Sequence, residues 1–400
     1  MDFAHTRQEN DQELSGRIDA IRSGEDLEVL EPFAKAYLGL FYDIDNQHAP
    51  LERIRLLANE QLAAAILDGL QQVLLRPDLP KVDEITRASL QQQSQSVGYA
   101  VLAGVALQAH QDTDRLVELP ELTLQSAICF HHFISTFHDD NWYKPLLIAR
   151  PELSAQTLLA MWQVLIDEKK DFLPGLRPIL QEPELIPLFR IIAAPLLKMW
   201  RQCRHRDLVQ LLGLALLHVD RQDLLEVANE ILARGELLNL RNQVYWQATA
   251  FLLAPEARGQ AMLGFMGQEK MKLLPFLDFT ISLLDNKQGE SFRLSASGYA
   301  FLIRCLAQKF TPQLDIYDNL GEITLKVLWL FYQLACFSKE QGAEALKSLR
   351  RVRVLKLYSD IFDSVATCQA QNHKPDFQTF VQSLRDEGRL RMKKNWHDVR

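Results

Sequence analysis

The sequence predicts an all-α protein, folded as an irregular HEAT- or TPR-like α-solenoid of antiparallel helix pairs. A Pro-Glu-Leu tripeptide begins at Pro120, Pro151 and Pro183, with spacings of 31 and 32 residues. Repeats of 20–50 residues are typical of solenoids built from stacked helical units. Apolar residues recur with helical periodicity along nearly the whole chain. Glycine (17) and proline (16) are sparse in 400 residues, which disfavours the many turns of an all-β protein.

The tripeptide is suited to the start of a helix. Proline is favoured at the first helical position, where its missing N–H would have no partner, and glutamate complements the positive end of the helix dipole. Apolar residues follow each proline in phase, at eight, fourteen and twenty-eight residues. They are Ile128, Leu159 and Ile191, then Ile134, Leu165 and Leu197, then Ile148, Ile179 and Leu211.

The periodicity predicts helices over 11–23, 27–43, 50–75, 83–111, 120–138, 151–168, 184–203, 206–218, 221–234, 238–253, 256–266, 268–284, 292–310, 321–338, 350–370 and 376–394. Prolines are dense over 174–195, and Pro187 and Pro195 fall inside an expected helix, which they should kink or break. We therefore expect N-terminal repeats over 1–173, a proline-rich bend over 174–195, and C-terminal repeats with a basic end over 196–400.

Charge and cysteine usage favour a cytoplasmic protein without global affinity for nucleic acid. The net charge is −7, although residues 341–400 carry more Lys and Arg than Asp and Glu. The five cysteines are scattered and form no CxxC pair, which is typical of reduced thiols. No signal peptide and no membrane-spanning run are expected, so a membrane partner is not predicted.

One cluster offers candidate metal or acid/base chemistry. His131 and His138 lie seven residues apart and Asp139 follows, so a helix would place the histidines on one face. His and Asp side chains can hold zinc or transfer protons. The alternative is that the histidines edge a core, because their neighbours are mostly aromatic and aliphatic.

A second cluster is basic. Lys and Arg side chains can neutralise phosphates, and the nearby Trp396 could stack on a base. The alternative is a solvated helix face. The candidate nucleic-acid contacts are Lys347, Arg350, Arg351, Arg353, Lys356, Arg391, Lys393 and Lys394.

Common catalytic motifs are absent. The sequence contains no P-loop, no G-x-S-x-G elbow and no H-E-x-x-H, so it indicates no catalytic residue and no cofactor. Gly98 and Gly104 lie in a helix rich in small residues, which is better explained by close helix packing than by phosphate binding.

Several phrases resemble the helical-repeat region of large bacterial NACHT-type (STAND) NTPases, which are implicated in sensing and anti-phage defence. They are Ala149-Arg150-Pro151-Glu152-Leu153, Ala233-Arg234-Gly235-Glu236-Leu237-Leu238, and Val244-Tyr245-Trp246-Gln247-Ala248 leading to Phe251-Leu252-Leu253-Ala254-Pro255. The resemblance spans about residues 10–270. It implies a sensor or scaffold part without the nucleotide site, since the chain has no Walker residues.

These observations predict a non-catalytic helical-repeat protein with a protein partner, acting as an interaction scaffold or sensor module in bacterial defence or signalling. A nucleic-acid-binding protein using the basic C-terminal region is one alternative hypothesis. An all-α enzyme with a His/Asp site near 131–140 is another.

Overall fold

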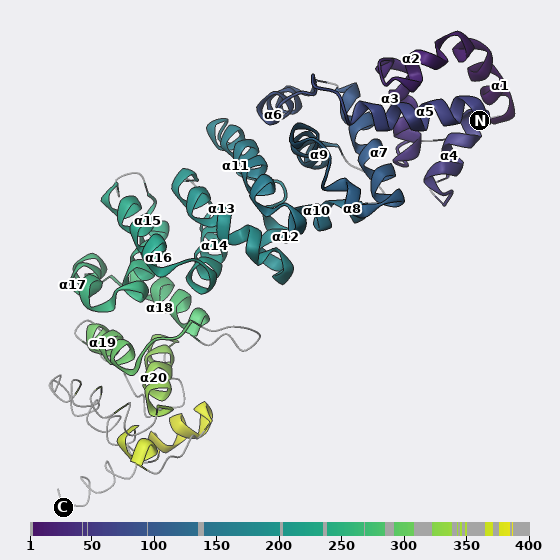
Figure 1. The fold of residues 1–400 in the computed structure, drawn as a ribbon. Helices are drawn as coiled ribbons and strands as arrows, with labels where there is room; N and C mark the ends of the chain where they lie inside the picture. Colours follow the sequence, from purple (N-terminus) through teal and green to yellow (C-terminus); the bar gives the residue numbers. More distant parts are fainter. Residues whose placement is uncertain are drawn as a thin grey trace, which may run out of the picture. The chain divides into compact units, whose positions relative to one another are not determined.

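A computed structural model describes most of the chain as helix. The described residues are 3–41, 43–45, 47–93, 95–134, 140–200, 203–234, 238–267, 269–284, 292–307, 322–337, 342, 345, 349, 365–370, 376–384 and 386. These residues form helices and connecting turns and contain no β-strand, which confirms the all-α class (Figure 1). The chain divides into two compact units, Met1–Trp200 (unit 1) and Arg201–Arg400 (unit 2). The expected division into repeats flanking a bend at 174–195 stays a prediction.

Unit 1 contains helices of very different lengths. Its described elements are α1 (Phe3–Leu14), η1 (Ser15–Arg17), α2 (Ile18–Arg22), α3 (Leu27–Tyr37), α4 (Pro50–Leu57), α5 (Glu60–Val73), α6 (Val82–Leu90), α7 (Ser96–Gln111), α8 (Thr113–Leu116), α9 (Glu121–Phe133), η2 (Asp140–Trp142), α10 (Tyr143–Ala149), α11 (Pro151–Asp167), α12 (Leu176–Gln181), η3 (Pro183–Leu185) and α13 (Ile186–Met199). Along this unit α5 packs on α7, α7 on α9, α9 on α11, and α11 on α13.

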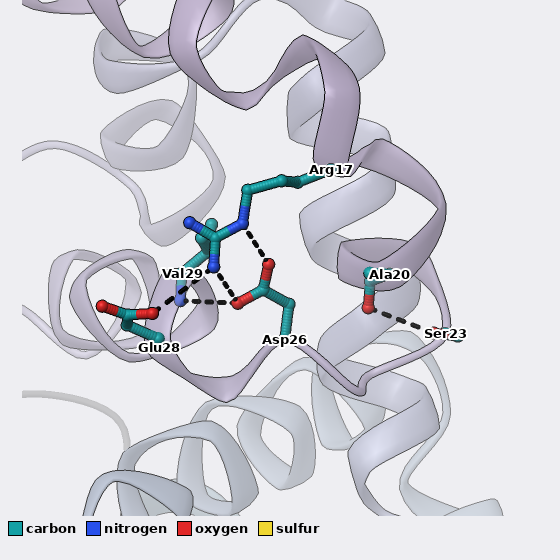
Figure 2. Close-up of polar contacts among 6 residues, drawn as sticks. All are labelled: Arg17, Ala20, Ser23, Asp26, Glu28 and Val29. Carbon is teal, nitrogen blue, oxygen red and sulfur yellow. Dashed lines mark hydrogen bonds and ion pairs between the residues drawn. The ribbon is translucent and has the colours of Figure 1, made fainter.

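The start of α3 is held by a bidentate ion pair (Figure 2). The Asp26 carboxylate accepts the N–H of Val29 at 3.3 Å, which caps the helix, and it faces the Arg17 guanidinium with two contacts of 2.7 Å. Glu28 lies 3.5 Å from the same guanidinium. Arg17 thus ties η1 to the first turn of α3.

Helix α7 packs closely on its neighbours because glycines replace side chains at the contacts. A Cβ at Gly104 would lie 2.4 Å from the Leu70 carbonyl oxygen, and one at Gly98 would lie 2.7 Å from the Phe130 ring. A Cβ at Gly69 on α5 would lie 2.1 Å from the carbonyl oxygen of Ile21. The predicted role of Gly98 and Gly104 in close helix packing is confirmed.

The three Pro-Glu-Leu tripeptides do open helical segments. Pro120 is the N-cap of α9, Pro151 is the first residue of α11, and Pro183 begins the 3₁₀ turn η3 that leads into α13. The in-phase apolar positions are not equivalent, however. Ile128 is fully buried, whereas Ile191 and Ile148 are 37% and 46% exposed. The three segments opened by the tripeptide are therefore not equivalent in how they pack.

Two long predicted helices are broken, and three short helices, α8 among them, were not predicted. The expected helix over 50–75 stops at Leu57 and restarts at Glu60, because the Asn59 side chain caps α5 by accepting the N–H of Leu62 at 2.9 Å. The expected helix over 83–111 ends after Leu90, where Gln92 adopts a positive φ of 56°. Helices α8, α10 and α12 are additional.

The prolines near the end of unit 1 are accommodated within a helix. Pro187 lies in the first turn of α13, where the missing N–H costs nothing. Pro195 lies inside α13, and the helix continues to Met199. The helix is therefore not broken at these prolines, and the predicted kink stays a prediction.

Unit 2 contains α14 (His205–His218), α15 (Arg221–Ala233), α16 (Leu240–Leu253), α17 (Pro255–Met266), α18 (Lys270–Leu284), α19 (Ala296–Ala307) and α20 (Glu322–Ala335) among its described elements. Within it α14 packs on α16, α16 on α18, and α18 on α20. The asparagine and aspartate before α16 and α15 cap these helices with their side chains. Leu208, Leu211, Leu212, Ala215 and Leu216 are buried along α14.

Aromatic side chains fill the contacts between the helices of unit 2. The Phe251 ring lies 6.0 Å from that of Phe276 on α18 and 6.1 Å from that of Phe301 on α19. Tyr245 lies 5.5 Å from Phe279. Phe251 and Phe276 are fully buried, so rings from three helices share one core.

Candidate functional site

His131, singled out from the sequence, and its neighbour His132 lie in the last turn of α9. The helix ends at Phe133, and Ile134 follows in an extended conformation. The 3₁₀ turn η2 and the start of α10 bring Trp142 and Tyr143 back to this helix end. Four aromatic or imidazole rings therefore gather where α9 ends and α10 begins.

The rings of this cluster (His131, His132, Trp142 and Tyr143) pack directly against one another. His131 stacks on Tyr143 with ring centroids 3.9 Å apart and planes inclined by 19°. Trp142 meets His131 edge-on at 5.5 Å. The Tyr143 hydroxyl lies 2.7 Å from His132 Nε2. This arrangement resembles a small aromatic core more than an open binding site.

A loop between α11 and α12 closes over His132. Gly175 has a φ of +76°, and a Cβ there would lie 2.5 Å from the His132 ring, so the backbone rests on the imidazole. The loop is anchored beside it by the Trp162 indole N–H, which donates to the Pro174 carbonyl oxygen at 2.8 Å. His132 thus joins three segments that are distant in the sequence.

The charge state of His132 is unsuited to proton transfer near neutral pH. Burial, followed by the adjacent His131, lowers the pKa of His132 to about 3. The imidazole is therefore neutral, and its Nε2 shares a hydrogen bond with the Tyr143 hydroxyl. General acid/base catalysts work best with a pKa near the working pH, which His132 does not have.

The buried thiols are also unreactive. Burial raises the pKa of Cys129 to about 12, although Thr86 Oγ1, at 3.5 Å from its sulfur, opposes that shift. In unit 2, burial and then Asp207 raise the pKa of the Cys203 thiol. Because the thiolate is the nucleophile and the metal ligand, neither cysteine is suited to either role.

An ion-pair group ties α10 to η3. The Lys144 ammonium lies 2.6 Å from a carboxylate oxygen of Glu182 and also pairs with Glu184. Hydrogen bonds to Glu182 and then Glu184 raise the pKa of Lys144. The group is largely solvent-exposed, so it adds little to stability, and it fixes the direction of α10 beneath the aromatic cluster.

The structure describes one of the three residues of the predicted metal site. His131 lies in the aromatic cluster, whereas His138 and Asp139 fall outside the described residues. Among the residues that are described, no three His, Cys, Asp or Glu side chains gather closely enough to hold a metal ion.

The proposed nucleic-acid contacts also fall outside the described part of the chain. This holds for all eight residues: Lys347, Arg350, Arg351, Arg353, Lys356, Arg391, Lys393 and Lys394. In unit 2 the fold does bring two other basic residues together, since Arg241 Nη1 lies 3.4 Å from His205 Nε2. Because 36 residues separate them, no local sequence pattern predicted this contact.

Sequence reasoning missed the partners of His132. Tyr143 and Trp142 stood close to the histidines in the sequence, but only the turn η2 shows that they fold back. Gly175 had one usable signal, the Pro174-Gly175 dipeptide, which is typical of a turn.

No protein-family model, curated protein or solved structure was found to match this chain. Across the described helices, none is both long and apolar enough to cross a membrane.

Proposed function

We propose that the chain is a non-catalytic helical-repeat protein that binds a protein partner as a scaffold or sensor module. One observation carries the proposal. In each unit, alternate helices pack in succession: α5, α7, α9, α11 and α13 in unit 1, and α14, α16, α18 and α20 in unit 2. Such a succession is what stacked helical units require, and stacked units create extended binding surfaces.

The chemistry of the candidate site supports a role without catalysis. His132 is neutral and covered by Gly175, and burial suppresses the Cys129 thiol. Catalytic groups need a pKa near the working pH, and His132 and Cys129 have pKa values far from it. This cluster is therefore better suited to packing than to catalysis.

The biological process and the cellular location in this proposal are inferred from the sequence. The phrases shared in style with NACHT-type NTPases favour the sensor or scaffold part of a bacterial defence or signalling system. The scattered cysteines favour the cytoplasm. Both belong to the proposal.

The test is affinity purification of the tagged full chain from its native host after cross-linking in the cell. The expected result is a protein retained in near-stoichiometric amount over a tag-only control. Treatment with nuclease should leave that partner bound. Recovery of no protein above the control would contradict the proposal, and loss of the partner on nuclease treatment would favour the nucleic-acid alternative.

A sharper version of the test uses surface variants. Phe172 is 70% exposed in unit 1 and Met271 is 80% exposed in unit 2, so alanine at either position should leave the fold intact. Interfaces depend on exposed apolar and aromatic side chains. We expect at least one of the two variants to reduce partner recovery, whereas the matched variant Glu13→Ala on an exposed helix face should not.

A further inference from the structure

Helix α1 differs from the other long helices of unit 1 in how little it buries. None of its twelve residues is buried, whereas α5 buries seven of its fourteen. The face of α1 that is half-buried carries Phe3, Thr6, Asn10, Asp11 and Leu14. Apolar burial supplies most of the stability of short helices, and an isolated helix of twelve residues is marginal in water.

Polar side chains attach α1 to the junction between α4 and α5. Asn10 Nδ2 donates to the Leu57 carbonyl oxygen at 2.8 Å, and the Asn59 N–H donates to Asp11 Oδ1 at 3.0 Å. Leu57 is the last residue of α4 and Asn59 is the N-cap of α5. Two consecutive residues of α1 therefore satisfy an acceptor and a donor where the helix path is interrupted.

The remaining junction is organised without α1. The Asn59 side chain caps α5, and the Ala58 N–H donates to the Ile54 carbonyl oxygen at 3.0 Å within the end of α4. Hydrogen bonds to solvent can replace those of Asn10 and Asp11 at small net cost, because a typical bond contributes little beyond its exchange with water.

We propose that α1 is a strap that undocks while the rest of unit 1 stays folded, opening and closing the α4–α5 junction. When the strap is closed, the Leu57 carbonyl and the Asn59 amide are engaged by α1. When it is open, both groups are available to water or to a bound partner. This device does not depend on the identity of the partner in the proposed function.

Native-state hydrogen exchange of the full chain, followed by mass spectrometry at neutral pH, tests the strap. Segments with few buried contacts open with free energies near zero, so peptides from 3–14 should exchange at least about 100-fold faster than peptides from α5. Low urea should accelerate exchange in α5 but leave exchange in α1 nearly unchanged, since undocking exposes little surface.

Paired variants identify the contacts that hold the strap. Asn10→Ala with Asp11→Ala should speed exchange of α1 about tenfold further and raise exchange at the Asn59 amide. The control Gln12→Ala with Glu13→Ala, on the exposed face, should change neither. Protection of α1 equal to that of α5, or the same urea dependence in both, would overturn the proposal. So would acceleration by the double variant that is uniform across unit 1.

Discussion

Two helix contacts of unit 1 are backbone to backbone at glycines, whereas α16, α18 and α19 of unit 2 meet through aromatic rings. At Gly69 and Gly104 a Cβ would lie 2.1 Å and 2.4 Å from carbonyl oxygens of neighbouring helices. In unit 2, Gly264 has no atom within 4 Å of a Cβ position, and the nearest atom at Gly213 is 3.4 Å away. A Cβ at Gly342 would lie 2.2 Å from the Gln369 side chain, so the tight contact there is with a side chain and not with a carbonyl group. The Phe251 ring of this unit faces rings from two other helices.

The contrast separates two ways of packing an all-α protein. Close approach depends on the absence of a side chain, so any added atom must displace a carbonyl group. Packing by rings depends on volume, so any lost atom leaves a cavity. The glycine contacts of unit 1 and the ring contacts of unit 2 should therefore fail under opposite kinds of mutation.

The largest expected effect is loss of volume in unit 2. Phe251→Ala should lower the free energy of unfolding by about 3–5 kcal/mol, because the removed ring leaves a cavity between three helices. Urea unfolding followed by circular dichroism measures the change. The matched control Phe172→Ala, at an exposed position, should stay within about 0.5 kcal/mol of wild type. Equal effects at the two positions would remove the basis for the ring-packed core.

The second-largest expected effect is a loss of stability when a methyl group is added at a glycine contact in unit 1. Gly104→Ala and Gly69→Ala should each destabilise the protein by about 1–3 kcal/mol, since the new methyl group would press on the carbonyl oxygens of Leu70 and Ile21. Thermal or urea unfolding provides the measurement. Wild-type stability in both variants would mean that the helices of unit 1 can separate freely, and the contrast between the units would disappear.

Acid should weaken unit 1 through His132. The pKa of this imidazole is about 3 in the folded chain and near 6.5 when exposed. Between these two pH values the unfolded state therefore binds a proton that the folded state does not bind. Stability therefore falls as pH drops from about 6.5 toward 3. The loss should reach about 1 kcal/mol at pH 5 once the partial exposure of the ring is allowed for. His132→Gln should flatten this slope, whereas the matched variant His205→Gln, at an exposed site in unit 2, should keep it.

The smallest expected effect is an increase in stability. Gly264 lies in α17 with open space around its Cβ position, so Gly264→Ala should stabilise unit 2 by about 0.4–1 kcal/mol by restricting the unfolded chain. A rise in melting temperature is the readout. A loss comparable to that of Gly104→Ala would show that the space beside Gly264 does not accept a methyl group.

The fold class and the helix starts could be predicted because their signals are local. Pro151 fits the first turn of α11 on its own stereochemistry, and Gly98 and Gly104 stand in an apolar helix where only packing explains them. The break at Asn59 also had a local signal, an asparagine followed by a glutamate, but the continuous apolar pattern around it outweighed that signal in the prediction.

The candidate site could not be predicted in the same way. The contacts of His132 with Tyr143 and Gly175 join residues 11 and 43 positions apart, and they depend on how α10 and α12 fold back. Helical periodicity says which face of α9 is apolar, but not which distant loop covers it. The seven-residue spacing of His131 and His138 suggests a metal or acid/base pair, but it carries no information on the Trp142 and Tyr143 rings that pack against His131.

The buried cysteines give each unit its own chemical reporter. Cys129 lies in unit 1 and Cys203 in unit 2, both buried, and burial leaves both thiols protonated at neutral pH. Alkylating reagents attack thiolates, so each sulfur becomes reactive when its own surroundings open. The half-buried Cys336 and Cys368 would label earlier, and these two and Cys305 can be replaced beforehand. The rates of labelling at positions 129 and 203 would then time the opening of one unit against the other within a single intact chain.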